Sequence, residues 1–150
     1  MLIRSLGCPR IFPPGSRRCR SGAVYRGVDI FAALRAQGRA LAVFTGASSR
    51  AAGMLVRSAG LHVDVLIGGD HVSRPKPAPD GILLAAKEIG IDAVDIAYVG
   101  GSPLDLRAAV GAGSRGAAEA WGHMYGQAER ADVVLSGPCR HLISCSSGTS

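Results

Sequence analysis

Residues 95–106 have the sequence DIAYVGGSPLDL, in which a short apolar run leads into two glycines, a serine and a proline. The run at 95–99 has the length and composition of a buried strand. Ser102 is a residue type that caps helices and Pro103 suits the first helical position, which predicts a helix from Pro103 to near Gly113. A buried strand leading directly into a helix is typical of α/β proteins with a parallel sheet.

The same alternation of helix and strand patterns fills the rest of the central sequence. Apolar residues spaced for one helix face predict helices, and glycines just beyond them predict where the helices end. The expected helices cover 28–37, 48–60, 79–89 and 103–113, and the expected strands cover 40–44, 63–67, 95–99, 114–120 and 132–135. The residues expected to be buried on these helices are Ile30, Phe31, Leu34, Met54, Leu55, Ala59, Ile82, Leu83, Ala86, Ile89, Leu106, Ala109 and Val110.

Length and composition fit one domain built from these elements. The chain has 150 residues, of which 47% are hydrophobic and 5% aromatic, a mixture that favours small-residue packing of helices on a sheet. We therefore expect an α/β fold with a Rossmann-like parallel sheet and flanking helices over residues 22–137. Residues 1–21 are expected to form a disordered basic tail and residues 138–150 a flexible C-terminal tail.

The net charge of +6 comes from the N-terminal segment. Six arginines precede Asp29, the first acidic residue, and the remainder has 11 basic and 11 acidic side chains. A nucleic-acid-binding face would spread basic residues over the folded surface, often with aromatic residues, so no nucleic-acid partner is expected. No apolar run has the length of a membrane span or a secretory signal, so we expect no membrane partner and a cytoplasmic location.

Three polar residues follow predicted strands, where ligands bind in open α/β sheets. Thr45 follows the strand at 40–44, Lys76 lies in the sequence RPKPAP at 74–79, and Asp105 follows the strand at 95–99. A hydroxyl and backbone N–H groups can donate to phosphate oxygens, an ammonium can neutralise their charge, and a carboxylate can hold Mg²⁺. Each residue also has a simpler interpretation, as a turn residue, a solvated loop lysine and a first-turn acid respectively.

These residues belong to three motifs whose order and separation resemble the haloacid dehalogenase superfamily, specifically its phosphoglycolate-phosphatase-like branch. The motifs are FTG at 44–46, GD at 69–70 with RPKPAPD at 74–80, and YVGGSPLDL at 98–106, and the resemblance runs over about residues 24–135. It implies that Thr45, Gly46 and Lys76 bind the transferred phosphoryl group, with Thr45 and Lys76 catalytic, and that Asp105 lies beside Mg²⁺. It further implies hydrolysis of a small phosphorylated metabolite.

Two features depart from the pattern of this family. Gly101 stands where the family has the earlier acid of its last motif, and a glycine offers a cation only its backbone carbonyl. The first motif, an Asp-x-Asp that supplies the nucleophile, is also missing, because no aspartate precedes Asp29. Asp29 itself is expected to be a cap or first-turn acid. We therefore expect a truncated core, without the first strand and the cap, that is inactive or very weak as an enzyme.

The resemblance implies that the missing first strand would lie at the centre of the sheet, between the strands that end at Thr45 and Val99. Its loss would leave two inner edges, so we expect either that these strands pair directly or that part of residues 1–12 is recruited between them, with low stability. Two alternatives stay open: a non-catalytic phosphate-binding or interaction protein that keeps Thr45 and Lys76, and an unselected fragment without activity. His123, in a loop after the last strand candidate, has no assigned role.

Overall fold

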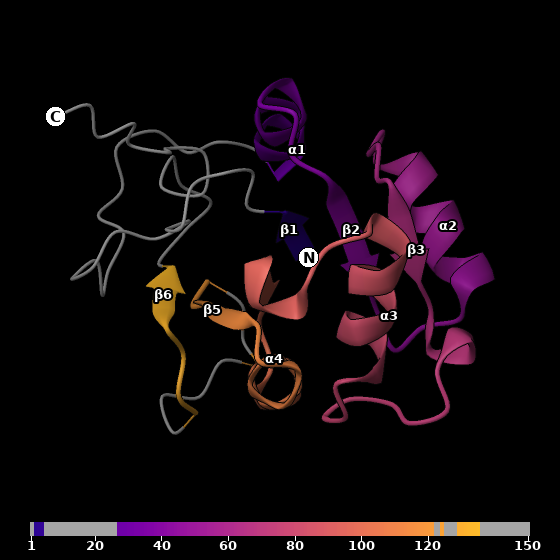
Figure 1. Ribbon diagram of the computed structural model, residues 1–150. Coiled ribbons are helices and arrows are strands. Elements are labelled where there is room, and N and C mark those ends of the chain that lie inside the picture. The colour runs from indigo at the N-terminus through magenta and orange to yellow at the C-terminus, as the bar shows by residue number, and fades with distance from the viewer. Residues whose placement is uncertain (1, 5–26, 122–123, 125–128, 136–150) are drawn as a thin grey trace, which may run out of the picture.

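A computed structural model describes residues 2–4, 27–121, 124 and 129–135, which form a six-stranded sheet with helices on both faces (Figure 1). The predicted fold class, a Rossmann-like parallel sheet with flanking helices, is confirmed, apart from one antiparallel strand. The helices are α1 (Gly27–Ala36), α2 (Ser49–Ser58), α3 (Asp80–Ile89) and α4 (Pro103–Ala112), with 3₁₀ turns η1 (Gly69–His71) and η2 (Ala93–Asp95). The strands are β1 (Leu2–Arg4), β2 (Leu41–Phe44), β3 (Val65–Ile67), β4 (Ile96–Gly100), β5 (Arg115–Glu119) and β6 (Val133–Leu135).

The strands are arranged in the order β3-β2-β1-β4-β5-β6. β2 is parallel to β3, and β4, β5 and β6 are parallel to one another. β1 is antiparallel to both of its neighbours, so β2 and β4 run in the same direction on either side of it. The carboxyl ends of the parallel strands therefore lie at one edge of the sheet, where ligands bind in α/β folds.

β1 fills the gap that the sequence predicted between β2 and β4. Leu2 lies opposite Ala42 and Tyr98, which confirms that part of residues 1–12 is recruited into the sheet. These three residues therefore differ from the disordered tail that was expected over 1–21. Arg4 lies opposite Ile96 at the start of β4, so the chain leaves β1 at the edge opposite the carboxyl ends. The expected tails at 5–21 and 138–150 lie outside the described residues.

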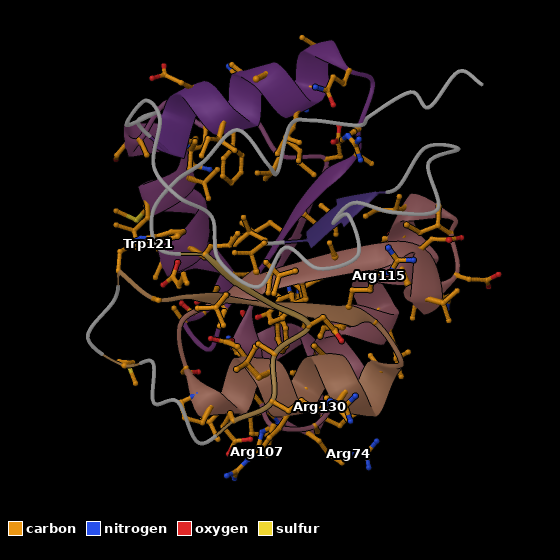
Figure 2. All side chains as sticks on the ribbon, turned by 90° about the vertical axis from the view of Figure 1, so that its left-hand side faces the viewer. Arg74, Arg107, Arg115, Trp121 and Arg130 are labelled. Atoms are coloured by element: carbon orange, nitrogen blue, oxygen red, sulfur yellow. The ribbon has the colours of Figure 1, made fainter. Side chains whose placement is uncertain are left out.

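Two apolar clusters lie on opposite faces of the sheet. On one face, Ile30 and Leu34 of α1 pack against Leu41 and the inward side chains of β4, β5 and β6. On the other face, α3 and α4 cover β2, β3 and β4, with Ile82 fully buried. Figure 2 shows α1 on one side of the sheet and α4 on the other. The sheet is thus covered on both faces, as a parallel sheet requires.

The helix ends match the local sequence signals. Ser48 caps α2 and Ser102 caps α4, each through a side-chain oxygen that accepts a backbone N–H bond. Gly90 and Gly113 end α3 and α4 with φ of 76° and 70°, a left-handed conformation that glycine adopts without a Cβ clash. Pro79 precedes α3 instead of forming its first residue, because the helix begins at Asp80, one residue later than predicted.

Several large apolar residues predicted to be buried are exposed instead. The positions that face the sheet are occupied by small residues, among them Ala52 and Gly53 on α2 and Ala108 and Ala109 on α4. Small residues let a helix approach the sheet closely, and the larger neighbours then lie on the outer side. The large residues concerned are Met54, Leu55, Leu83 and Val110, and Ala59, also predicted to be buried, is exposed at the end of α2. None of the described helices has the length and apolar character needed to cross a membrane.

Candidate functional site

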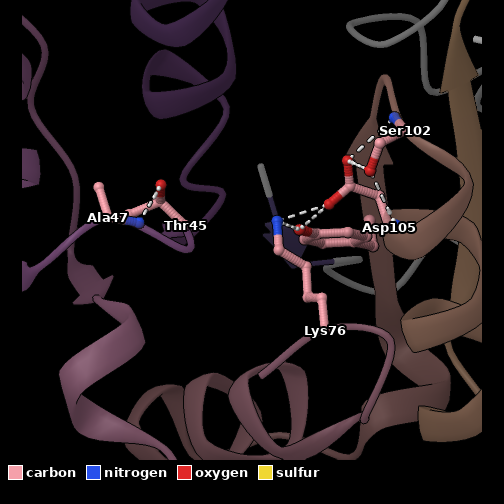
Figure 3. Close-up of polar contacts among 6 residues, drawn as sticks. Thr45, Ala47, Lys76, Ser102 and Asp105 are labelled. Atoms are coloured by element: carbon pink, nitrogen blue, oxygen red, sulfur yellow. Dashed lines mark hydrogen bonds and ion pairs between the residues drawn. The ribbon is translucent and has the colours of Figure 1, made fainter. Parts of the chain in front are cut away.

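The loop after β2 carries the first two predicted site residues. Thr45 is half-buried, and its backbone N–H donates to the Ile67 carbonyl oxygen at 3.0 Å. Its Oγ1 accepts a hydrogen bond from the Ala47 N–H at 3.2 Å, as Figure 3 shows. Gly46 is exposed, and a Cβ placed on it would meet no atom within 4 Å. The loop is therefore anchored at Thr45 and has open space beside Gly46.

A second loop, after β3, holds the first one in place. The Gly69 N–H donates to the Ala47 carbonyl at 2.8 Å, and a Cβ on Gly69 would lie only 2.6 Å from the Gly46 carbonyl oxygen. Asp70 accepts two hydrogen bonds at the start of α2, from the Ser49 N–H and from Ser49 Oγ, each at 2.7 Å. These bonds, led by that from the hydroxyl, hold the pKa of Asp70 below its usual value. The two loops thus form one rigid unit.

Lys76 and Asp105 form an ion pair at the same edge of the sheet. Lys76 Nζ lies 2.6 Å from Asp105 Oδ1 and donates a second hydrogen bond to the Tyr98 hydroxyl at 3.3 Å. The ammonium also lies 5.0 Å from the centre of the Phe44 ring, within cation–π range. The Lys76 and Asp105 side chains are 18% and 12% exposed. The Lys76–Pro77 peptide bond is cis.

Asp105 is also the residue that completes the cap of α4. Its Oδ2 accepts hydrogen bonds from the Ser102 N–H at 3.1 Å and from Ser102 Oγ at 2.8 Å, while the Asp105 N–H donates back to Ser102 Oγ. Burial alone would raise the pKa of Asp105. The hydrogen bond and charge of Lys76, with the bonds from Ser102, outweigh burial and hold that pKa below its usual value. Asp105 is therefore a carboxylate fixed on both oxygens.

Tyr98 connects the strand to this ion pair. Its ring is fully buried, and its hydroxyl donates to Asp105 Oδ1 at 3.0 Å. Burial, followed by the negative charge of Asp105, the hydrogen bond to Asp105 and the charge of Glu119, raises the pKa of Tyr98 far above its usual value. Tyr98 is consequently a protonated hydrogen-bond donor at neutral pH. Sequence reasoning gave it no role, because a tyrosine in an apolar strand resembles ordinary core.

Glu119 is a second acidic residue that sequence reasoning did not find. It ends β5, beside the end of β4. A Cβ placed on Gly101 would lie 2.3 Å from Glu119 Oε1, so the Glu119 side chain fills the space that a side chain at position 101 would need. An acidic residue at the carboxyl end of a strand is the signal that could have found it.

The described residues do not fit Mg²⁺ as they stand. Both oxygens of Asp105 already accept hydrogen bonds, one of them from an ammonium. Gly101 contributes no side chain, and across the described ranges no cluster of three or more His, Cys, Asp or Glu could hold a metal ion. A magnesium ion prefers six oxygen ligands in octahedral geometry, usually one or two carboxylates together with water. The carboxylate of Asp105 has no oxygen free to serve as such a ligand.

The structure thus brings some predicted residues together and separates others. Lys76 and Asp105 are in direct contact, whereas the described hydrogen bonds of Thr45 are made within its own loop and with β3 (Figure 3). Asp29 is exposed in the first turn of α1, as predicted. His123 lies outside the described residues.

The fold and this edge define a class of protein: a parallel α/β core with a threonine–glycine loop, a fixed lysine and a fixed aspartate at the carboxyl ends of its strands. The profile of the haloacid dehalogenase-like hydrolases matches residues 18–113. The chain therefore belongs to the haloacid dehalogenase-like hydrolase family, in its phosphoglycolate-phosphatase-like branch.

Two curated relatives show the extent of the match. The chain is 39% identical over 104 residues to a probable phosphatase, IndB, of Dickeya dadantii, covering 67% of this chain and 45% of that protein. It is 34% identical over 102 residues to phosphoglycolate phosphatase of Escherichia coli, covering 67% of this chain and 40% of that protein. The chain thus spans less than half the length of these relatives.

Solved structures agree with this assignment. CbbY from Rhodobacter sphaeroides, solved in complex with phosphate, is similar with a TM-score of 0.64 and 32% identity, over 73% of this chain and 51% of that one. A putative β-phosphoglucomutase from Thermotoga maritima has a TM-score of 0.70 at 24% identity, over 79% of this chain and 57% of that one, and supports the fold alone.

Proposed function

We propose that the protein is a phosphatase-type hydrolase of small phosphate monoesters and that this chain supplies the phosphate-binding part of its site. Thr45, Gly46 and Lys76 bind the phosphate group, with Thr45 and Lys76 as the catalytic residues that position it and offset its charge. The observation that carries the proposal is the Lys76 ammonium, which Asp105 and the Tyr98 hydroxyl fix at the carboxyl edge, 5.0 Å from the ring centre of Phe44, the residue before Thr45. The similarity to phosphatases supports it.

The contacts of Lys76 leave it able to bind an anion. An ammonium has three N–H donors, and among the described residues Asp105 and Tyr98 accept from two of them. The third can donate to a phosphate oxygen. The Thr45 hydroxyl and the backbone N–H of Gly46 can donate from the other side, where the space beside Gly46 is open. Donors held rigidly before the ligand arrives bind charge without reorganisation.

The chemical step needs more than these residues. Members of this family generally use Mg²⁺ together with an aspartate that accepts the phosphoryl group, and no aspartate precedes Asp29 in this sequence. Asp105 is the residue proposed to face Mg²⁺ in a complete site, although here its oxygens are engaged. We therefore expect these 150 residues to bind phosphate esters with little or no turnover.

A cytoplasmic location and a small-molecule substrate, with neither nucleic acid nor membrane as partner, remain part of the proposal.

Calorimetric titration of the chain with inorganic phosphate tests the binding site. Lys76→Met should weaken binding about tenfold, because it removes a charge-assisted hydrogen bond, and Thr45→Val should weaken it by about fivefold. Arg74→Met is the matched control, since it removes one positive charge from the same loop. Arg74 is paired with Asp80 and points out to solvent in Figure 2, so this variant should bind like the unmodified chain. Equal affinity in all four proteins would refute the proposed site.

A further inference from the structure

The Lys76 ammonium, the Tyr98 hydroxyl and the Asp105 carboxylate form a closed triangle of hydrogen bonds. Lys76 Nζ lies 2.6 Å from Asp105 Oδ1 and 3.3 Å from the Tyr98 hydroxyl oxygen, and that oxygen lies 3.0 Å from the same Oδ1. A hydroxyl has one proton to donate and lone pairs that accept. Because the Tyr98 proton is donated to Asp105, the hydroxyl oxygen faces Lys76 as an acceptor.

The Tyr98 hydroxyl is held in place by the scaffold. Tyr98 is 1% exposed, and its ring packs against that of Phe44 with 6.5 Å between the ring centres. Its backbone lies in β4, opposite Leu2 of β1 and Gly116 of β5. Lys76, by contrast, carries its charge on a flexible four-carbon stem. The tyrosine is therefore the fixed member of the pair and the lysine is the member that needs to be oriented.

The other contacts of Lys76 hold its charge but leave its orientation less defined. The ammonium lies 5.0 Å from the centre of the Phe44 ring and 6.0 Å from that of Tyr98, so both rings attract the positive charge without fixing the direction of its N–H groups. With Asp105 as the only hydrogen-bond acceptor, the ammonium could rotate about that one bond. A second acceptor at a fixed position, the Tyr98 oxygen, removes this freedom.

We propose that Tyr98 is a positioning residue of the phosphate site, whose hydroxyl orients the Lys76 ammonium so that the remaining N–H group points to the anion. This inference rests on the proposed function, in which Lys76 binds the phosphate group. Tyr98 acts through Lys76 and needs no contact with the ligand. Donors that are ordered before a ligand arrives bind it without reorganisation, so loss of the Tyr98 hydroxyl should weaken phosphate binding.

The chain contains only two lysines, Lys76 and Lys87, which makes the orientation of Lys76 measurable by NMR. Lys87 is exposed on α3 and serves as an internal reference. With ¹⁵N at lysine Nζ, at mildly acidic pH and without phosphate, the Lys76 ammonium should give a narrow resonance that Lys76→Met removes. Lys87 should give a broad one, because its protons exchange freely with water. Tyr98→Phe, which keeps the ring, should broaden or shift the Lys76 resonance and leave Lys87 unchanged.

Ser114→Ala is the matched control for loss of a buried hydroxyl. Ser114 is buried, and its hydroxyl donates to the Ala109 carbonyl at 3.2 Å, within α4 and its end rather than at the ion pair. This variant should leave both lysine resonances unchanged. In calorimetric titrations with inorganic phosphate, Tyr98→Phe should bind about fivefold more weakly than the unmodified chain, the equivalent of one ordinary hydrogen bond. Ser114→Ala should bind like the unmodified chain.

Two results would overturn the positioning role of Tyr98. One is a Lys76 resonance that Tyr98→Phe leaves unchanged, and the other is a perturbed resonance with unaltered phosphate affinity. If Tyr98→Phe does not fold, a Lys76 resonance as broad as that of Lys87 in the unmodified chain would overturn it as well. Absence of phosphate binding by the unmodified chain would instead refute the proposed function, and the lysine resonances would still show whether Tyr98 orients Lys76.

Discussion

At the scale of single residues, Asp105 connects three parts of the structure. It completes the capping box of α4 with Ser102, accepts the hydroxyl of Tyr98 from β4, and pairs with Lys76 from the loop before α3. Its negative charge is thus used by the folded protein before any ligand binds. Removing that charge should leave the Lys76 ammonium mostly buried without its counter-ion.

Asp105→Asn should therefore destabilise the chain. We expect the free energy of unfolding at neutral pH to fall by roughly 2–3 kcal/mol, somewhat less than for a fully buried pair because both side chains keep some exposure. Chemical denaturation at pH 7 measures it. Removal of the exposed partner Arg74 from its pair with Asp80 should change little, since that pair is solvated. Equal effects of the two substitutions would contradict a structural role for the Lys76–Asp105 pair.

The lowered pKa of Asp105 also predicts how stability depends on pH. A carboxyl group whose pKa is lower in the folded state stabilises the protein above its unfolded pKa of about 3.9, and this contribution is lost as the pH falls through the folded pKa. Acidification below about pH 4 should thus destabilise the unmodified chain more steeply than Asp105→Asn. Parallel slopes in denaturation series over this range would show that the pKa of Asp105 is unshifted.

Sequence reasoning identified the site residues that belong to motifs and missed those contributed by packing. Lys76 was found because it lies within a proline-rich loop, Asp105 because it follows a strand, and their motifs occur in the order of the family. Glu119 was missed because its partner in space is Gly101, eighteen positions earlier in the sequence, and only the pairing of β4 with β5 brings the two together. Position 101 supplies no carboxylate of its own, and the Glu119 side chain fills the space beside it. Gly101→Asp would have to displace Glu119.

At the scale of elements, helix positions were easier to predict than helix faces. Caps are local signals. Ser102 marks the start of α4, and the left-handed Gly90 and Gly113 mark the ends of α3 and α4, as expected. The buried face depends on how closely each helix approaches the sheet, which no local pattern specifies. Met54 and Leu55 were therefore predicted to be buried, although Ala52 and Gly53 make the closer contact.

Two glycines in helices give a matched test of this packing. A Cβ on Gly81 of α3 would lie 2.3 Å from the ring of Phe44, so Gly81→Ala should destabilise the chain by about 1–3 kcal/mol. A Cβ on Gly53 of α2 would lie 3.7 Å from Leu66, an ordinary contact. Gly53→Ala should therefore stabilise by up to about 1 kcal/mol through helix propensity. Thermal unfolding of both variants measures the difference, and a shift of the same sign in both would contradict the described packing.

At the scale of the whole molecule, β1 joins two parts of the sheet. β2 and β3 form one parallel pair and β4, β5 and β6 form another group. β1 pairs with β2 through Leu2 and Ile3 and with β4 through all three of its residues. The sequence predicted that this gap would be filled, because unpaired inner edges cost free energy. It could not predict the antiparallel direction of β1, which depends on the path of residues outside the motifs.

Ile3→Pro tests whether β1 holds the sheet together. In a strand with neighbours on both sides every N–H faces one of them, so proline should remove a ladder bond and cost roughly 3 kcal/mol or more. Ile3→Val, which keeps the N–H and a β-branched side chain, is the matched control and should unfold almost like the unmodified chain. We also expect the unmodified chain to have a low thermal midpoint, because so short a strand fills the centre. A sharp transition at high temperature, unaffected by Ile3→Pro, would contradict both expectations.

The most direct test of the central claim, a phosphate-binding core that by itself carries out little or no hydrolysis, is a ³¹P NMR experiment with a small phosphate monoester such as phosphoglycolate. The ester is mixed with a comparable amount of the chain, freed of host phosphatases, with and without Mg²⁺. We predict that the ester resonance shifts or broadens, that Lys76→Met reduces this effect, and that no inorganic phosphate accumulates. Mg²⁺-dependent accumulation of inorganic phosphate that Lys76→Met abolishes would contradict the account and would require a nucleophile elsewhere in these 150 residues.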